Sequence, residues 1–260
     1  MNVAVWSNGL EVTGDGTGIV SHAGLGLLRR LADKTGVTSG FSRALAAGRV
    51  LDHHRGRALA GLACAIAGGA RAISDFRVLA DQAEAFGQVA SVPTAYRTLE
   101  EIAGGGEKTA RKLTAAVSTA RRHAWSQIAA RHGTLPGVRV ADQALDGVTC
   151  IRIDATVTPA HSEKELAEAN FKGFGHHPLL AYCDNTGGEP LAWMLRKGSA
   201  GSNTAADHIA ITDAAIAALP PAYRRNLMIT VNGAGFSHAL LEHLDKLAAR
   251  RGHTLIYSAG

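Results

Sequence analysis

The spacing of apolar residues changes near residue 140, and this change constrains the fold more than any other feature of the chain. Between residues 24 and 131, Ala, Leu and Arg dominate, and leucines such as Leu25 and Leu28 recur at helical spacing. From Val148 onward, short apolar runs alternate with turns rich in Gly, Asn and Pro. The sequence therefore predicts a helical part followed by an α/β part, with the boundary in a connector at 135–147.

The first part, residues 1–140, is predicted to hold about five helices. One covers Ala58–Ala67, and another is opened by Ser91-Val92-Pro93-Thr94, which has the composition of an N-cap with Pro in the first turn. This second helix and a short one before it are compatible with a helix-turn-helix, although ordinary bundles show the same pattern. Short β-like stretches at Val3–Trp6 and Leu10–Thr13 predict a small N-terminal arm.

The second part, residues 147–260, is predicted to contain strands and helices in the order βββαβαβ. A right-handed crossover after the first three strands would place the fourth strand beside the first. The ends of those two strands then lie together. The predicted strands cover 148–154, 177–183, 190–196, 227–231 and 254–257, and the helices cover 203–219 and 237–251.

Two polar residues stand where the neighbouring strands end. Asp154 closes the first strand, which we expect to be covered on both faces, and Asn232 follows the fourth. An isolated Asp at a strand end more commonly caps a turn. In ribonuclease-H-like enzymes, however, adjacent strand-end acids hold two divalent metals about 3.5–4 Å apart for phosphodiester chemistry. Here one of the two expected carboxylates is an amide.

The basic residues are unevenly distributed along the chain. Residues 1–150 hold 17 Lys and Arg against 12 Asp and Glu, whereas residues 151–260 hold 10 of each. This excess and a pI near 9.3 are typical of proteins with a polyanionic partner. In the long helix before the connector, the basic residues form either a solvated face or a phosphate-contacting face: Arg111, Lys112, Arg121 and Arg122.

Three basic residues of the second part are further candidates for contact with a nucleic-acid backbone. Lys164 lies in a polar stretch, His161–Lys164, which follows Asp154 and is otherwise an ordinary loop. Arg196 and Lys197 precede a Gly- and Ser-rich stretch that predicts a flexible exit from a hairpin.

Other features argue against several classes of site. Cys64, Cys150 and Cys183 are far apart, which predicts small core residues and neither a disulfide framework nor a thiolate zinc site. The adjacent His176 and His177 point to opposite sides of a strand, which disfavours metal ligation. Apolar runs fall short of the about 20 residues that cross a membrane, and no leader is evident, so we expect a cytosolic protein.

Several ordered segments together resemble the transposases of bacterial insertion sequences, of the DDE group 1 type and insertion-sequence family 1380. The similarity covers essentially the whole chain. The segments are 53–57 (HHRGR), 86–94 (FGQVASVPT), 151–156 (IRIDAT) followed by 161–164 (HSEK), 172–179 (KGFGHHPL), 184–187 (DNTG) and 196–203 (RKGSAGSN).

The resemblance implies a helical DNA-binding region followed by a ribonuclease-H-like catalytic core, which cuts and joins double-stranded DNA at terminal inverted repeats. Mg²⁺ or Mn²⁺ would serve as cofactor, and the protein would act as a homo-oligomer on DNA in the bacterial cytosol, associated with the nucleoid. Asp154 matches the first metal-binding acid. The second acid belongs in the segment Val231-Asn232-Gly233-Ala234-Gly235, where this chain has Asn232.

The third acid of the family, a Glu on a later helix, has no counterpart before Gly260, so we expect a core that is incomplete at its C-terminus. An amide at residue 232 removes an anionic ligand. We therefore expect strand cleavage to be impaired. The alternative is a non-catalytic, DNA-binding remnant of a transposase, and a weaker one is a related nuclease acting on RNA or branched DNA.

Overall fold

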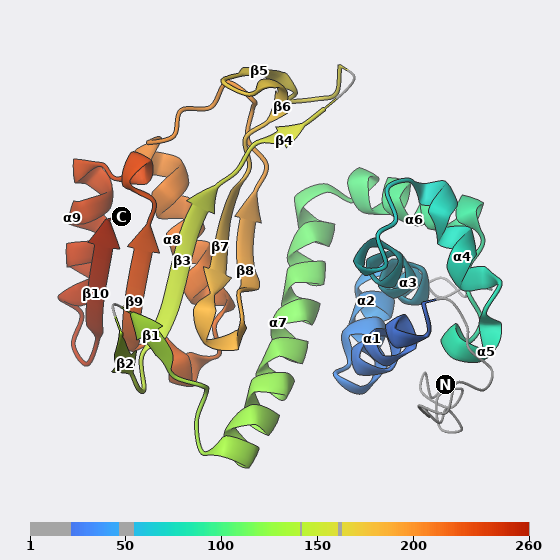
Figure 1. Ribbon diagram of the computed structural model, residues 1–260, viewed down its shortest axis with the longest axis horizontal. Helices are drawn as coiled ribbons and strands as arrows, with labels where there is room; N and C mark the ends of the chain where they lie inside the picture. Colours follow the sequence, from blue (N-terminus) through green and yellow to red (C-terminus); the bar gives the residue numbers. More distant parts are fainter. Residues whose placement is uncertain (1–21, 47–54, 141, 161–162, 260) are drawn as a thin grey trace. The chain divides into compact units, whose positions relative to one another are not determined.

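The computed structural model describes residues 22–46, 55–140, 142–160 and 163–259 (Figure 1). The chain divides into two compact units between Ala124 and Trp125, inside a long helix. Each unit is described separately below. The predicted N-terminal arm and His53-His54 lie outside the described residues, and the predicted domain limits stay predictions.

The first unit is helical, as the sequence predicts. The long helix α7 begins at Gly106 and continues into the second unit. Ser91 caps α6 as expected, because its Oγ accepts a hydrogen bond from the backbone N–H of Thr94 at 3.3 Å. The helices are α1 (Ala23–Lys34), α2 (Val37–Leu45), α3 (Arg55–Ala67), a 3-10 helix (Ile73–Phe76), α4 (Arg77–Ala80), α5 (Ala83–Phe86), α6 (Val92–Gly104) and α7 (Gly106–His132).

The core of this unit is built mainly on α3. Phe76, Leu79 and Phe86 are each no more than 2% exposed. They belong to one apolar cluster with Ala58 and Ala95. Small residues on α3 allow close helix packing, since a side chain at Gly61 would meet the ring of Phe76 at 2.9 Å. The 3-10 helix and α5 therefore supply the aromatic side chains of this core, and α4 supplies Leu79.

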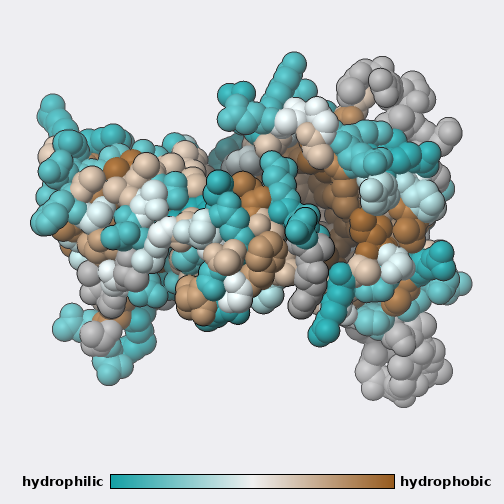
Figure 2. Space-filling view, turned by 90° about the horizontal axis from the view of Figure 1, so that it is seen from above, coloured by the Kyte–Doolittle hydropathy of each residue, from teal (hydrophilic) through white to brown (hydrophobic). Residues whose placement is uncertain are grey.

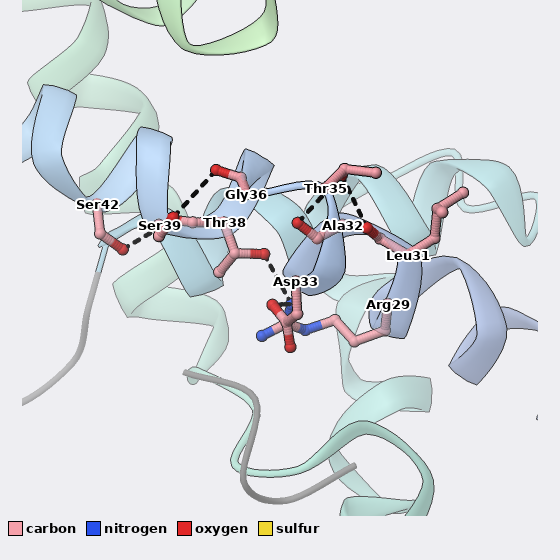
Figure 3. A network of polar contacts seen from close by, with 9 residues as sticks. All are labelled: Arg29, Leu31, Ala32, Asp33, Thr35, Gly36, Thr38, Ser39 and Ser42. Atoms are coloured by element: carbon pink, nitrogen blue, oxygen red, sulfur yellow. Dashed lines mark hydrogen bonds and ion pairs between the residues drawn. The ribbon is translucent and has the colours of Figure 1, made fainter. Parts of the chain in front are cut away.

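Helix α1 buries the side chains of Arg29 and Asp33, whereas Leu27, Leu28 and Leu31 are exposed. The guanidinium of Arg29 forms a buried ion pair with Asp33 and donates a hydrogen bond of 2.9 Å to the hydroxyl of Thr38 on α2 (Figure 3). Leu27 and Leu31 are 51% and 56% exposed. The helical spacing of the leucines thus predicts the helix correctly but does not mark its buried face. Figure 2 shows apolar residues gathered on the surface of this unit.

The second unit contains a five-stranded mixed sheet with the strand order β10-β9-β3-β7-β8 (Figure 1). The central strand β3 pairs in parallel with β9 and antiparallel with β7. The chain order of strands and helices is the predicted βββαβαβ. The elements are β3 (Thr149–Ala155), β7 (Leu179–Cys183), β8 (Glu189–Met194), α8 (Ala205–Ala218), β9 (Asn226–Val231), α9 (His238–Ala248) and β10 (Thr254–Ala259).

Helix α8 packs against β8, β7 and β3, and α9 packs against β10 and α8. The side chains that alternate onto this face of the sheet are fully buried, including Ile151, Ile153 and Ala181. The prediction that the first strand is covered on both faces holds for its N-terminal half. It is wrong at Arg152, whose side chain is 45% exposed on the face opposite α8.

The sequence did not predict two smaller sheets in this unit. The connector forms a hairpin of β1 (Val138–Val140) and β2 (Gln143–Leu145). Between β3 and β7, the strands β4 (Thr158–Pro159), β5 (Glu168–Asn170) and β6 (Gly173–His176) form a separate three-stranded sheet beyond the end of β3 (Figure 1). Strands of two to four residues are too short to give a period-2 pattern.

Candidate nuclease site at the end of the parallel strands

Asp154 and Asn232 lie at neighbouring positions on adjacent parallel strands. Ile153 of β3 is in register with Val231 of β9, and each of the two polar residues is the next one along its strand. Asp154 alternates with the buried Ile153 and so belongs to the face of the sheet opposite α8, and Asn232 is the first residue beyond the end of β9. Asp154 is half-buried and Asn232 is exposed. The adjacency that the sequence predicts is therefore present.

A tight loop follows Asn232 and is supported by a buried histidine. The backbone N–H of Gly235 donates a hydrogen bond of 2.7 Å to the carbonyl of Asn232, which closes a 3-10 turn over Gly233–Gly235. His208 on α8 is 2% exposed, and its Nδ1 lies 3.0 Å from the carbonyl oxygen of Thr204. His208 could not be recognised from the sequence, because a histidine in the first turn of a helix carries no motif of its own.

The donor atoms at this edge do not suit a pair of divalent metals. Such a pair requires several anionic oxygens, and the edge offers the carboxylate of Asp154 and the neutral amide of Asn232. Among the described residues there is no group of three or more His, Cys, Asp or Glu side chains that could hold a metal ion. The described side chains at this edge therefore do not form a complete two-metal site.

The predicted backbone-contacting residues near this edge differ in their environments. Lys164 is exposed. The ammonium of Lys197 is 3.4 Å from a carboxylate oxygen of Glu168 on β5, and its side chain is 61% exposed. Arg196, in contrast, is 4% exposed. Its guanidinium donates to the carbonyls of His177 and Gly201 and forms an ion pair with Asp207.

The stretch after Arg196 is more closely packed than the predicted flexible exit. The N–H of Gly198 donates a hydrogen bond of 3.1 Å to the carbonyl of Leu166, and Lys197 forms an isolated β-bridge with His176. The hydroxyl of Ser199 donates to the carboxylate of Glu168. These contacts fasten the segment to the three-stranded sheet.

The basic residues of α7 also differ from one another. Arg111 is exposed and forms an ion pair of 3.3 Å with Glu107 one turn earlier. Lys112 and Arg122 are exposed. Arg121 is only 5% exposed, which does not suit a contact with solvent-borne phosphates. Three of the four predicted residues therefore present their charge to solvent.

The description "Transposase DDE domain group 1" belongs to a family whose model matches residues 4–246 of this chain. That match covers most of the sequence, from the helical unit to α9, and includes the paired ends of β3 and β9. The chain is a member of the transposase DDE domain family. Comparisons with curated proteins and with solved structures gave no match.

Membership of the transposase family fits the architecture of helices followed by a mixed sheet, and transposase domains of this type act on DNA and generally use a divalent metal. No helix within the described ranges is both long and apolar enough to span a bilayer.

Other polar residues of the transposase have structural roles. The Nε2 of His176 lies 3.0 Å from the carbonyl oxygen of Glu165, and the Nδ1 of His177 lies 2.9 Å from that of Ala200. Asp184 forms the turn after β7 and pairs with Arg152 at 3.3 Å. Cys64, Cys150 and Cys183 are buried, as predicted for small core residues.

Asn185, which the sequence marked only as part of the turn 184–187, organises the entry to β3. Its carbonyl oxygen accepts the backbone N–H of Cys150 at 2.8 Å. Its amide nitrogen donates to the carbonyls of Pro136 and Val148, each at 2.9 Å. A turn between β7 and β8 therefore holds both the connector and the first residues of β3, which fixes the strand that carries Asp154.

Proposed function

We propose that this chain is the transposase of a bacterial insertion sequence of family 1380, and that it binds the terminal inverted repeats and cuts and joins DNA there. The observation that carries the proposal is the position of Asp154 beside Asn232 in a member of the transposase family. Asp154 is the first metal-ligand position, and Asn232 stands in the place of the second.

The proposed catalytic core is ribonuclease-H-like. Its support is the strand order, in which the first strand of the series is central. The second and third strands, β7 and β8, follow it as antiparallel neighbours, whereas β9 and β10 lie parallel on its other side. A sheet of this kind collects the carboxyl ends of β3, β9 and β10 at one edge, where strand-end acids can hold Mg²⁺ or Mn²⁺.

The helical unit is proposed to bind double-stranded DNA, and the protein to act on the repeats as a homo-oligomer in the bacterial cytosol. Exposed basic residues on α7 support this role: Arg111, Lys112 and Arg122. Lys164 and Lys197 are proposed to contact the DNA backbone near Asp154. Arg121 and Arg196 are left out of this set because both are buried.

Strand cleavage is proposed to be impaired. An amide oxygen carries no full negative charge, so Asn232 would bind a divalent cation more weakly than a carboxylate at the same place. The two-metal mechanism needs charge on both sides of the reacting phosphate. The same observation favours a second candidate function, a transposase remnant that occupies the terminal repeats without cutting them.

A nicking assay separates the two functions. Purified protein is mixed with a supercoiled plasmid that carries the repeats flanking its own coding sequence, with Mg²⁺, Mn²⁺ or EDTA. Slow, metal-dependent nicking that is lost in Asp154→Ala supports the enzyme. Tight binding that falls steeply with salt, ignores the metal and yields no nicks supports the remnant.

A matched control keeps the result specific to the site. Asp213→Ala removes an exposed carboxylate of α8 that lies 2.8 Å from the Nε2 of His243 on α9 and belongs to none of the proposed sites. This variant is expected to nick and bind as the parent does. Failure of the parent to bind the repeats in low salt would contradict both candidate functions.

A further inference from the structure

An exposed tryptophan lies in the same row of the sheet as Asp154. Asp154 on β3 is in register with Leu180 on β7, and Leu180 is in register with Trp193 on β8. Residues in register across a sheet point to the same side, so Trp193 and Asp154 share the face opposite α8. Trp193 is 71% exposed, which is unusual for a large aromatic side chain.

A β-bulge determines which side Trp193 faces. Leu191 and Trp193 are two residues apart, and in a regular strand they would point the same way. Leu191 is 6% exposed, however, and the register between β7 and β8 shifts at Ala181/Tyr182. The extra residue of the bulge reverses the alternation, so the indole is turned away from the core.

The backbone positions of Asp154 and Trp193 are about 10 Å apart, because the two residues are separated by two strand spacings of about 4.8 Å each. The indole therefore stands beside the proposed cleavage position and not at it. Leu195, the first residue after β8, is 45% exposed, and the side chain of Lys197, two residues further along the chain, is 61% exposed. An exposed aromatic plane beside the position proposed for the reacting phosphate matches a nucleotide, which presents a flat base next to its phosphate.

We propose that Trp193 is a stacking platform for an unpaired base of the DNA end whose phosphate lies at Asp154. This inference rests on the proposed DNA function. It adds a substrate class, DNA with an unpaired or extruded nucleotide next to the reacting position. Because β8 is held by β7 and α8, the platform is preorganised and its stacking face is already exposed before DNA binds.

Intrinsic fluorescence gives a direct test. The chain has three tryptophans, and Trp125 is 2% exposed and packed edge-on against Tyr223. In a Trp6→Phe background, emission that responds to added DNA reports on Trp193. The probe is an oligothymidylate of about 12 nucleotides, within the site size of single-strand-binding grooves. Saturable quenching of the emission is expected, together with protection from iodide.

Affinity measurements with the full chain complete the test. By fluorescence anisotropy, Trp193→Ala is expected to weaken binding of the labelled oligothymidylate roughly tenfold, the scale of one base–aromatic stack. Trp193→Phe should retain most of the affinity, and the affinity for fully paired duplex should change little. Ile256→Ala is the control, because it removes a side chain that is 45% exposed on β10 outside the row of Asp154.

The outcomes separate this inference from the proposed function. The stacking role alone would be overturned by the following result. The parent nicks in a metal-dependent way and binds duplex, but oligothymidylate does not quench its emission, and Trp193→Ala binds oligothymidylate with the same affinity as the parent. Without DNA, the emission of the parent could instead change with protein concentration, and Trp193→Ala could lose self-association. That result would assign the indole to contact with a second copy and would also overturn the stacking role. A folded parent that binds no DNA at all would instead contradict the proposed function itself.

Discussion

The imidazole of His208 occupies the space that a side chain on Gly235 would need. A Cβ built on Gly235 would lie 2.6 Å from the Nε2 of His208 and 2.8 Å from a methyl group of Val231. The loop that carries Asn232 therefore rests directly on α8. This contact ties α8, the helix between β8 and β9, to the loop in which Asn232 holds the proposed second ligand position.

Gly235→Ala is accordingly expected to destabilise the second unit by about 1–3 kcal/mol, the usual cost of overpacking. Adding His208→Ala should recover part of the loss, because the smaller side chain makes room for the new methyl group. Urea unfolding of the single and double variants measures both values. Gly201→Ala is the control, since its added Cβ would meet nothing closer than 3.6 Å.

Asn232→Asp is expected to strengthen binding of Mn²⁺, because it places a second carboxylate next to Asp154. Titration calorimetry without DNA should show an affinity at least about tenfold higher than the parent, equal to about 1.4 kcal/mol. The double variant Asp154→Asn, Asn232→Asp should lose this gain. An unchanged Mn²⁺ affinity in the single variant would argue that the two side chains do not share an ion.

Asn185→Ala is expected to lower the free energy of unfolding by about 3 kcal/mol, because it leaves the buried N–H of Cys150 without its acceptor. Asn185→Asp should be similarly harmful, since a carboxylate cannot donate to the carbonyls of Pro136 and Val148. Chemical denaturation measures both. Asn203→Ala, at an exposed position, should change stability by no more than about 0.5 kcal/mol.

The thiol of Cys150 should make stability fall at high pH. Burial, reinforced by the charge of Asp184, raises the pKa of this thiol to about 11. In the unfolded chain the thiol ionises at lower pH than in the folded protein. As the pH rises, ionisation therefore lowers the free energy of the unfolded state first. The denaturation midpoint is expected to drop as pH rises from about 9 to 11. Cys150→Ala should reduce that slope.

Asp33→Ala should destabilise the helical unit by about 3–5 kcal/mol, because it removes the carboxylate from the buried guanidinium of Arg29. Leu31→Ser, on the exposed side of the same helix, should change the free energy of unfolding by less than about 0.5 kcal/mol. Thermal melts followed by circular dichroism would compare the two. A larger effect of Leu31→Ser would indicate that the leucine face is covered in solution.

Sequence patterns predicted the order of strands and helices around the five-stranded sheet and the place of Asp154 near the end of β3, because strands of five or more residues, rich in apolar side chains, stand out between turns. The neighbours Asp154 and Asn232 followed from the handedness of one crossover. The buried face of α1 could not be predicted, since Arg29 and Asp33 satisfy each other only after Thr38 packs beside them.

Several site features depend on tertiary contacts that leave no local pattern. Arg196 precedes a Gly- and Ser-rich stretch and looked accessible, yet Asp207 and two carbonyls bury its guanidinium. His208 and Asn185 act through partners far away in the sequence, Gly235 for His208 and Pro136, Val148 and Cys150 for Asn185. The outward direction of Trp193 depends on a bulge, and a period-2 pattern assigns it to the wrong side.

Because of the bulge, the number of residues in β8 matters as well as their chemical type, since it determines which face of the sheet each side chain takes. Loss of one codon at Leu191 would preserve the reading frame and delete only the unpaired position opposite Ala181 and Tyr182. Pro190 would then directly precede Ala192 and stay opposite Tyr182, but the buried side chain of Leu191 would be lost from the core. Selection on this gene should therefore tolerate substitutions in β8 more readily than single-codon insertions or deletions.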